Sequence, residues 1–198
     1  DVAFSGQPVE YNQAERWLCD QLLPAAGLTA AELLLVPGNH DVDRAATKPF
    51  LVGASQDALL ASRSEQTVAE VLQDPSQRAL LTKRLDAWWL FAKRLRPAAG
   101  DLPWWSLRRS IRGVEVFAAG LNSAMLCRGN EDHGRLLLGL HQVHAATEQA
   151  RGADLSLALM HHPFSFLAEW DSREVLPAIR APCGVLLRGH LHEADPSL

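Results

Sequence analysis

Three short polar segments hold many of the residues in this chain that can bind a metal ion or transfer a proton. They are Asn39-His40-Asp41, His161-His162 and His190-Leu191-His192. Imidazole nitrogens together with carboxylate and amide oxygens form the ligand sets of Zn, Mn and Fe sites. An isolated histidine is more often a structural residue, so each segment alone is a weak signal. Their joint occurrence predicts a metal site, and a metal ion at such a site can activate a water molecule for hydrolysis.

Each of these segments follows a short apolar run. The runs at 33–36, 155–160 and 184–187 are continuous and short, which is typical of buried strands. If the strands lie side by side, their carboxyl ends converge at one edge of the sheet, where open α/β sheets usually place ligands. The pattern therefore predicts that one sheet edge positions the three polar segments.

The rest of the chain alternates between helical and strand patterns. Apolar spacing predicts an amphipathic helix over 10–23, a helical segment over 50–97 and a short helix over 140–150. The runs 107–111 and 114–119 flank Arg112-Gly113 and predict a hairpin. This order of elements favours an α/β architecture in which helices cover the faces of a mixed sheet.

Length and composition favour one globular domain. The chain has 198 residues, of which 47% are hydrophobic and 21% charged, and its formal net charge is −4. This net charge argues against a protein that binds nucleic acid through a broad basic surface. Nucleic acid is therefore a possible partner that the charge does not indicate. The three cysteines form no C-x-x-C pair, and no apolar run approaches the ~20 residues that span a bilayer. We therefore expect a cytoplasmic protein without membrane contact.

Gly38-Asn39-His40-Asp41, His161-His162-Pro163 and Gly189-His190-Leu191-His192 resemble the ordered motif blocks of calcineurin-like metallophosphoesterases. The opening residues 1–6, with Asp1 as the aspartate, resemble the stretch after the family's G-D block. The branch that the chain looks most similar to acts on cyclic nucleotides and glycerophosphodiesters. The resemblance implies a mixed-sheet α-β-β-α sandwich, with 50–97 as a helical insertion or cap. It also implies hydrolysis of phosphate esters, favouring diesters, with two divalent ions of Mn, Fe or Zn.

The resemblance assigns roles residue by residue. The implied metal ligands are Asp1, Asn39, His161, His190 and His192. Asp1 matches the carboxylate that bridges both ions, His192 matches a ligand of the first ion, and the others match ligands of the second. His40 matches a histidine that does not bind metal and lies beside the scissile phosphate, where it can act as a general acid.

Four further residues are candidates near the reacting phosphate. Asp41 either orients the catalytic His40 or caps the following turn, and both alternatives are open. Arg44 is a candidate substrate contact, with a surface salt bridge as the alternative. His162 is expected to line the pocket, and Asn122, after a predicted strand, is expected to touch substrate.

Departures from the family pattern leave alternatives open. No D-x-H block precedes Asp1, and the sequence ends shortly after His192. We therefore expect residues 1–198 to be a single metallophosphoesterase domain that is incomplete at the N-terminus and at the C-terminus. Two alternatives to a self-contained phosphoesterase are a catalytic module of a longer, nuclease-like effector and a non-catalytic scaffold of this fold that binds partners.

Overall fold

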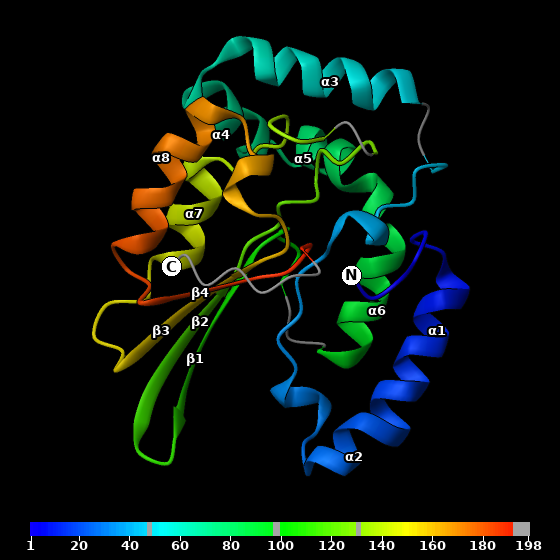
Figure 1. Ribbon diagram of the computed structural model, residues 1–198, viewed down its shortest axis with the longest axis vertical. Helices are drawn as coiled ribbons and strands as arrows, with labels where there is room; N and C mark the ends of the chain where they lie inside the picture. The colour runs from blue at the N-terminus through cyan, green and yellow to red at the C-terminus, as the bar shows by residue number, and fades with distance from the viewer. Residues whose placement is uncertain (47–48, 97–99, 130–131, 192–198) are drawn as a thin grey trace.

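The computed structural model describes residues 1–46, 49–96, 100–129 and 132–191 (Figure 1). Its sheet has four strands in the order β1-β2-β3-β4. β1 pairs with β2 antiparallel, whereas β2 with β3 and β3 with β4 are parallel. The strands are β1 Trp105–Ile111, β2 Val114–Gly120, β3 Leu155–Met160 and β4 Val185–Arg188. The predicted α/β class and the mixed sheet are therefore confirmed.

The predicted hairpin forms between β1 and β2. Its turn residues Arg112 and Gly113 have φ values of 52° and 83°. Positive φ at both central residues is the requirement of the two-residue turn that matches the twist of paired strands. Glycine adopts this conformation freely, and Arg112 is exposed, so the turn fixes the hairpin register at little cost.

Parallel pairing of β2, β3 and β4 depends on two crossover helices. α7 Leu140–Thr147 lies between β2 and β3 in the sequence, and α8 Glu169–Arg180 lies between β3 and β4. The two helices pack against each other beside the sheet (Figure 1). Because all three strands run the same way, Gly120, Met160 and Arg188 end at the same sheet edge.

Two acidic side chains bind the backbone just before and at the start of α7. Asp171 of α8 is completely buried and accepts hydrogen bonds from the amides of Leu138 and Gly139, both at 2.8 Å. Glu65 of α4 accepts a bond from the amide of Leu140 at 2.7 Å. Burial, together with the neighbouring Glu65 carboxylate, raises the pKa of Asp171 to about 7. These carboxylates link α4, α7 and α8.

The first predicted helix is longer than expected. α1 Pro8–Trp17 continues through a π-helical turn, Leu18–Leu22, into α2 Leu23–Ala26. The helix begins where Pro8 fits the first turn, and it ends at Gly27, which has a φ of 67°. α1 packs against α6 on the side of the molecule away from α7 and α8 (Figure 1).

The predicted helical segment over 50–97 is confirmed for its described residues. It consists of α3 Pro49–Ser62, α4 Glu65–Gln73, α5 Pro75–Thr82, a 3-10 turn Lys83–Leu85 and α6 Asp86–Leu95. Between α4 and α5, Asp74 accepts bonds from the amides of Ser76 and Gln77, and Pro75 opens the next helix. The apolar periodicity from residue 81 to 95 therefore spans two helices and the 3-10 turn that joins them.

The expected strand at 33–36 is wrong. This segment is extended but pairs with no strand among the described residues, and it precedes the 3-10 turn Asn39–Asp41. Side chains of β1 occupy backbone acceptors there: the Trp105 indole N–H donates to the Leu35 carbonyl at 2.8 Å, and Arg109 donates to Ala31 O at 3.3 Å. A neighbouring strand would need backbone carbonyls of this segment as hydrogen-bond acceptors, and the Leu35 carbonyl already accepts from Trp105. The described residues form one sheet, so they do not build the two-sheet sandwich.

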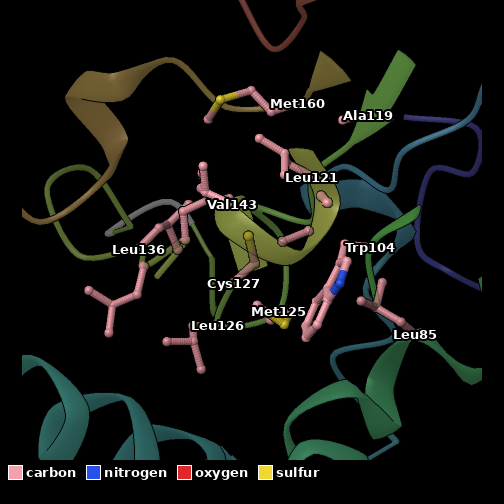
Figure 2. Packing of buried hydrophobic residues seen from close by; sticks show 14 of the residues in the cluster. Leu85, Trp104, Ala119, Leu121, Met125, Leu126, Cys127, Leu136, Val143 and Met160 are labelled. Atoms are coloured by element: carbon pink, nitrogen blue, oxygen red, sulfur yellow. The ribbon is translucent and has the colours of Figure 1, made fainter. Parts of the chain in front are cut away.

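The apolar core lies between the sheet, α7 and the loop after β2 (Figure 2). It combines residues from distant parts of the chain. They include Leu85 of the 3-10 turn before α6, Trp104 directly before β1, Leu121 and Cys127 after β2, and Val143 of α7. This packing fixes the strand ends from which the polar segments project. None of the helices described is long and apolar enough to cross a bilayer.

Candidate metal centre

Three side chains from separate segments converge at the carboxyl edge of the sheet. His161 follows β3, His190 follows β4, and Asn39 opens the 3-10 turn after the extended segment. His161 Nε2 lies 3.1 Å from Asn39 Oδ1 and 3.2 Å from His190 Nδ1. His190 Nδ1 and Asn39 Oδ1 are also 3.1 Å apart. The three atoms therefore form a nearly equilateral triangle.

Asp1 adds a carboxylate to this triangle. Its Oδ2 atom lies 3.3 Å from His161 Nε2. Its Oδ1 atom accepts a hydrogen bond from the backbone amide of His40 at 3.0 Å. One carboxylate thus binds the 3-10 turn and approaches the histidine cluster at the same time.

The arrangement suits a cation better than a hydrogen-bond network. His161 Nε2 carries at most one proton, so it can donate to only one of its three close neighbours. A proton on His190 Nδ1 would serve a further contact, whereas one cation between the donor atoms would satisfy all of them at once. Ligands that bind one ion at about 2.0–2.2 Å lie roughly 3.0–3.5 Å from each other, which matches the distances found here. Nitrogen and oxygen donors of this kind suit Zn, Mn or Fe.

Burial keeps these histidines neutral. His161 is 6% exposed, and its burial, with the histidines around it, lowers its pKa to about 2. Burial likewise lowers the pKa of His162 to about 3. A neutral imidazole offers a lone pair to a metal ion, so a low pKa favours ligation at ordinary pH. His161, His162 and His190 together form a cluster that can hold a metal ion.

The backbone at Gly38 and His190 allows the proposed ligands to lie close to the main chain. A Cβ atom on Gly38 would lie 2.1 Å from Asp1 Oδ1 and 2.8 Å from His161 Cε1, so a larger residue fits only if these side chains move. His190 has a φ of 70°, which is strained for a non-glycine residue. Strain of this kind persists where the surroundings enforce it, often at functional sites. Here Phe166 packs edge-on against the His190 ring, with 4.4 Å between centroids.

His40 lies next to the cluster with its ring held by the backbone. Its Nδ1 atom is 2.8 Å from the Phe4 carbonyl oxygen, which can only accept, so Nδ1 carries the proton. The Nε2 atom is then the ring nitrogen that can exchange a proton with substrate. His40, Asn39 and Arg44 line one pocket of about 320 Å³. Arg44 lines this pocket, so a contact to substrate stays the prediction for it, with a surface salt bridge as the alternative.

The catalytic role expected for Asp41 is not supported by its contacts. Its carboxylate is fully buried and accepts hydrogen bonds from the amides of Ala3 at 2.9 Å and Gly38 at 2.9 Å, and from the Tyr11 hydroxyl at 3.1 Å. The His40 ring is instead oriented by a carbonyl. Asp41 therefore joins the N-terminal segment to the 3-10 turn, a structural role that places Asp1 beside the histidines.

His162 and Asn122, the other two expected substrate contacts, are buried and do not line the pocket that holds His40 and Arg44. His162 is 1% exposed, with Nδ1 bonded to the Ser123 hydroxyl at 2.8 Å and Nε2 3.6 Å from Cys127 Sγ. Asn122 is also completely buried, and its Oδ1 atom accepts a bond from the amide of Ala124 at 2.9 Å. Both side chains are therefore buried, with His162 forming the innermost member of the histidine cluster. His192 lies outside the described residues.

One residue that acts at the site, Phe4, is not singled out for its role by sequence reasoning. Its carbonyl oxygen orients the His40 ring, and a backbone role of this kind leaves no signal in residue type. Ser123, like Asn122, follows a predicted strand and is a candidate substrate contact by its position in the sequence. In the structure the Ser123 hydroxyl contacts the His162 ring and accepts a hydrogen bond from the His162 backbone amide.

Comparisons with protein-family models, with curated proteins and with solved structures find no match for this chain.

Proposed function

We propose that this protein is a metal-dependent phosphoesterase that hydrolyses phosphate esters, phosphodiesters foremost, with the help of two divalent ions of Mn, Fe or Zn. One observation carries the proposal. Asn39 Oδ1, His161 Nε2 and His190 Nδ1 come from three distant segments and lie 3.1–3.2 Å from one another. The motif resemblance described above supports the same activity.

The residues present fit one cation site closely. Asn39, His161 and His190 would hold this ion, with Asp1 placed to share its carboxylate with a second one. His192 is the proposed contribution to that second ion. When bound, two such ions supply charge neutralisation for the phosphate and a nucleophilic water near neutral pH.

The protein's own groups would handle the leaving oxygen. Water adds its oxygen to phosphorus and releases a proton to solvent, the P–O bond to the alcohol breaks, and the alcohol oxygen takes a proton from Nε2 of His40, whose ring carries a proton on both nitrogens before the transfer. The products are the alcohol and a phosphate or phosphomonoester, and His40 regains its proton from solvent. Because Nδ1–H is held by Phe4, the Nε2 atom is kept available for this transfer. General acid catalysis of this kind contributes typically about 10²–10⁴-fold.

The test is hydrolysis of bis(4-nitrophenyl) phosphate by the purified protein with added Mn²⁺, beside metal analysis. Wild type is expected to bind metal and turn over the diester, whereas His161→Ala is expected to lose both. His144→Ala provides a matched control, because His144 lies on exposed α7 surface away from the cluster. Metal-loaded wild type without any turnover of diester or monoester would contradict the proposal.

A further inference from the structure

Phe4 is an exposed aromatic residue at the proposed catalytic pocket. Its side chain is 79% exposed, yet it lies against the His40 ring, with 5.4 Å between centroids and 32° between planes. Phe4, His40 and Arg44 line the same pocket of about 320 Å³. A single exposed aromatic side chain is ordinary on a protein surface, so the informative observation is that this ring contacts His40 at the pocket.

The ring is presented by a backbone that is fixed on both sides. Before Phe4, the amides of Val2 and Ala3 donate to the buried Asp41 carboxylate at 3.0 and 2.9 Å. After it, the amide and hydroxyl of Ser5 both donate to the Glu10 carboxylate at 3.1 Å. These bonds hold the Phe4 backbone and, through its carbonyl, the His40 ring.

The position of the ring follows from the direction of proton transfer. His40 delivers its proton to the leaving oxygen, so the alcohol part of the ester must lie next to His40. Phe4 packs on that same imidazole. Arg44, at the same pocket, offers a guanidinium to phosphate oxygens, and arginine favours such contacts. The cationic end of the pocket, at Arg44, and its apolar end, at Phe4, therefore match the phosphate and the alcohol part of an ester.

We propose that Phe4 is a specificity-determining residue that stacks on an aromatic ring in the alcohol part of the substrate, an inference that rests on the proposed phosphoesterase function. The preferred substrates are then esters whose leaving alcohol carries a planar aromatic group. Offset or tilted stacking between two rings adds to the burial of apolar area, so the preference is selective for rings over alkyl chains.

The test compares 2-phenylethyl and propyl esters of methyl phosphate, whose leaving alcohols are similarly acidic. Phe4→Ala is expected to lower kcat/KM for the phenylethyl ester roughly three- to tenfold while the propyl ester changes little, since ring contacts are worth about that much. Phe50→Ala is the matched control, because Phe50 is 80% exposed on α3 and does not line the pocket. Equal loss for both esters, or no loss for either, would overturn the assignment.

A second readout separates this inference from the proposed function. Affinity of the Mn²⁺-loaded protein for 2-phenylethylphosphonate and propylphosphonate can be measured by calorimetry without turnover. Phe4→Ala is expected to abolish the preference for the phenylethyl compound. An enzyme that binds both phosphonates yet cleaves no ester would contradict the catalytic proposal alone. Equal affinity of wild type for the two phosphonates would refute the role of Phe4.

Discussion

Replacing Gly38 by alanine perturbs the metal centre without straining the backbone. Gly38 has a φ of −109° and a ψ of −176°, an extended conformation open to any residue. The added Cβ would lie 2.1 Å from Asp1 Oδ1, so that oxygen must move by about 0.9 Å to restore a 3.0 Å separation. His161 Cε1, at 2.8 Å from the same Cβ, must also shift. The substitution thus displaces two proposed ligands together.

The size of that shift predicts a loss of metal affinity. Ligand positions in a metal site tolerate only about ±0.2 Å, and disturbing a neighbouring group typically costs 10–100-fold in affinity. We expect Gly38→Ala to weaken Mn²⁺ or Zn²⁺ binding by at least roughly tenfold. Because the Asp1 side chain is 30% exposed and can move aside, we expect the free energy of unfolding to fall by no more than about 1 kcal/mol.

Isothermal titration with the metal, beside urea unfolding, measures both quantities. Gly100→Ala is the matched control, because a Cβ at Gly100 meets nothing within 4 Å and its φ is not positive. Gly38→Ala protein that is folded and binds the ion as tightly as Gly100→Ala would refute the ligand roles of Asp1 and His161.

Three further predictions concern residues around the centre and the helical segment. His40→Gln is expected to lower kcat by about 10²–10⁴-fold while metal content stays at the wild-type value, and a parallel loss of metal would show that His40 is a ligand. Asp41→Asn places an amide donor against backbone donors, so we expect urea unfolding to show a loss of about 1–3 kcal/mol, and unchanged stability would refute its structural role. Asp171 has a raised pKa, about 7, so its proton stabilises the fold below about pH 4 and this contribution is lost as pH rises through 7. Glu65→Gln removes the like charge and can donate to Asp171, so the fall in unfolding free energy between pH 4 and 7 is expected to shrink; an unchanged pH profile would contradict the coupling.

The sequence predicts the parts of the fold that depend on local pattern. The hairpin at Arg112-Gly113 and the strand β3 follow from turn chemistry and from a short apolar run, and both are confirmed. The run 33–36 has the same pattern as β3 but forms no ladder with any described residue, and the carbonyl of its Leu35 accepts from the Trp105 side chain of β1 instead. Strand pairing depends on tertiary contacts that an apolar run does not encode.

In the candidate site, too, some features follow from local sequence pattern and others depend on tertiary contacts. Residue type and strand position bring His161 and His190 together, because β3 and β4 end at one sheet edge. Asn39 meets them from an extended segment that the sequence pattern predicts to be a strand. The hydrogen-bond partners of Asp41 and Asn122 could not be predicted from the sequence. A polar side chain in a loop can either face a pocket or accept hydrogen bonds from buried backbone amides. In the structure, the side chains of Asp41 and Asn122 both accept hydrogen bonds from backbone N–H groups.

The most direct test of the metal centre is an anomalous diffraction map from crystals of this protein grown with Mn²⁺ or Zn²⁺. A peak about 2.0–2.2 Å from Asn39 Oδ1, His161 Nε2 and His190 Nδ1 is the expected result. A metal-saturated crystal with no peak between these three side chains, or with its peak bound elsewhere, would contradict the account.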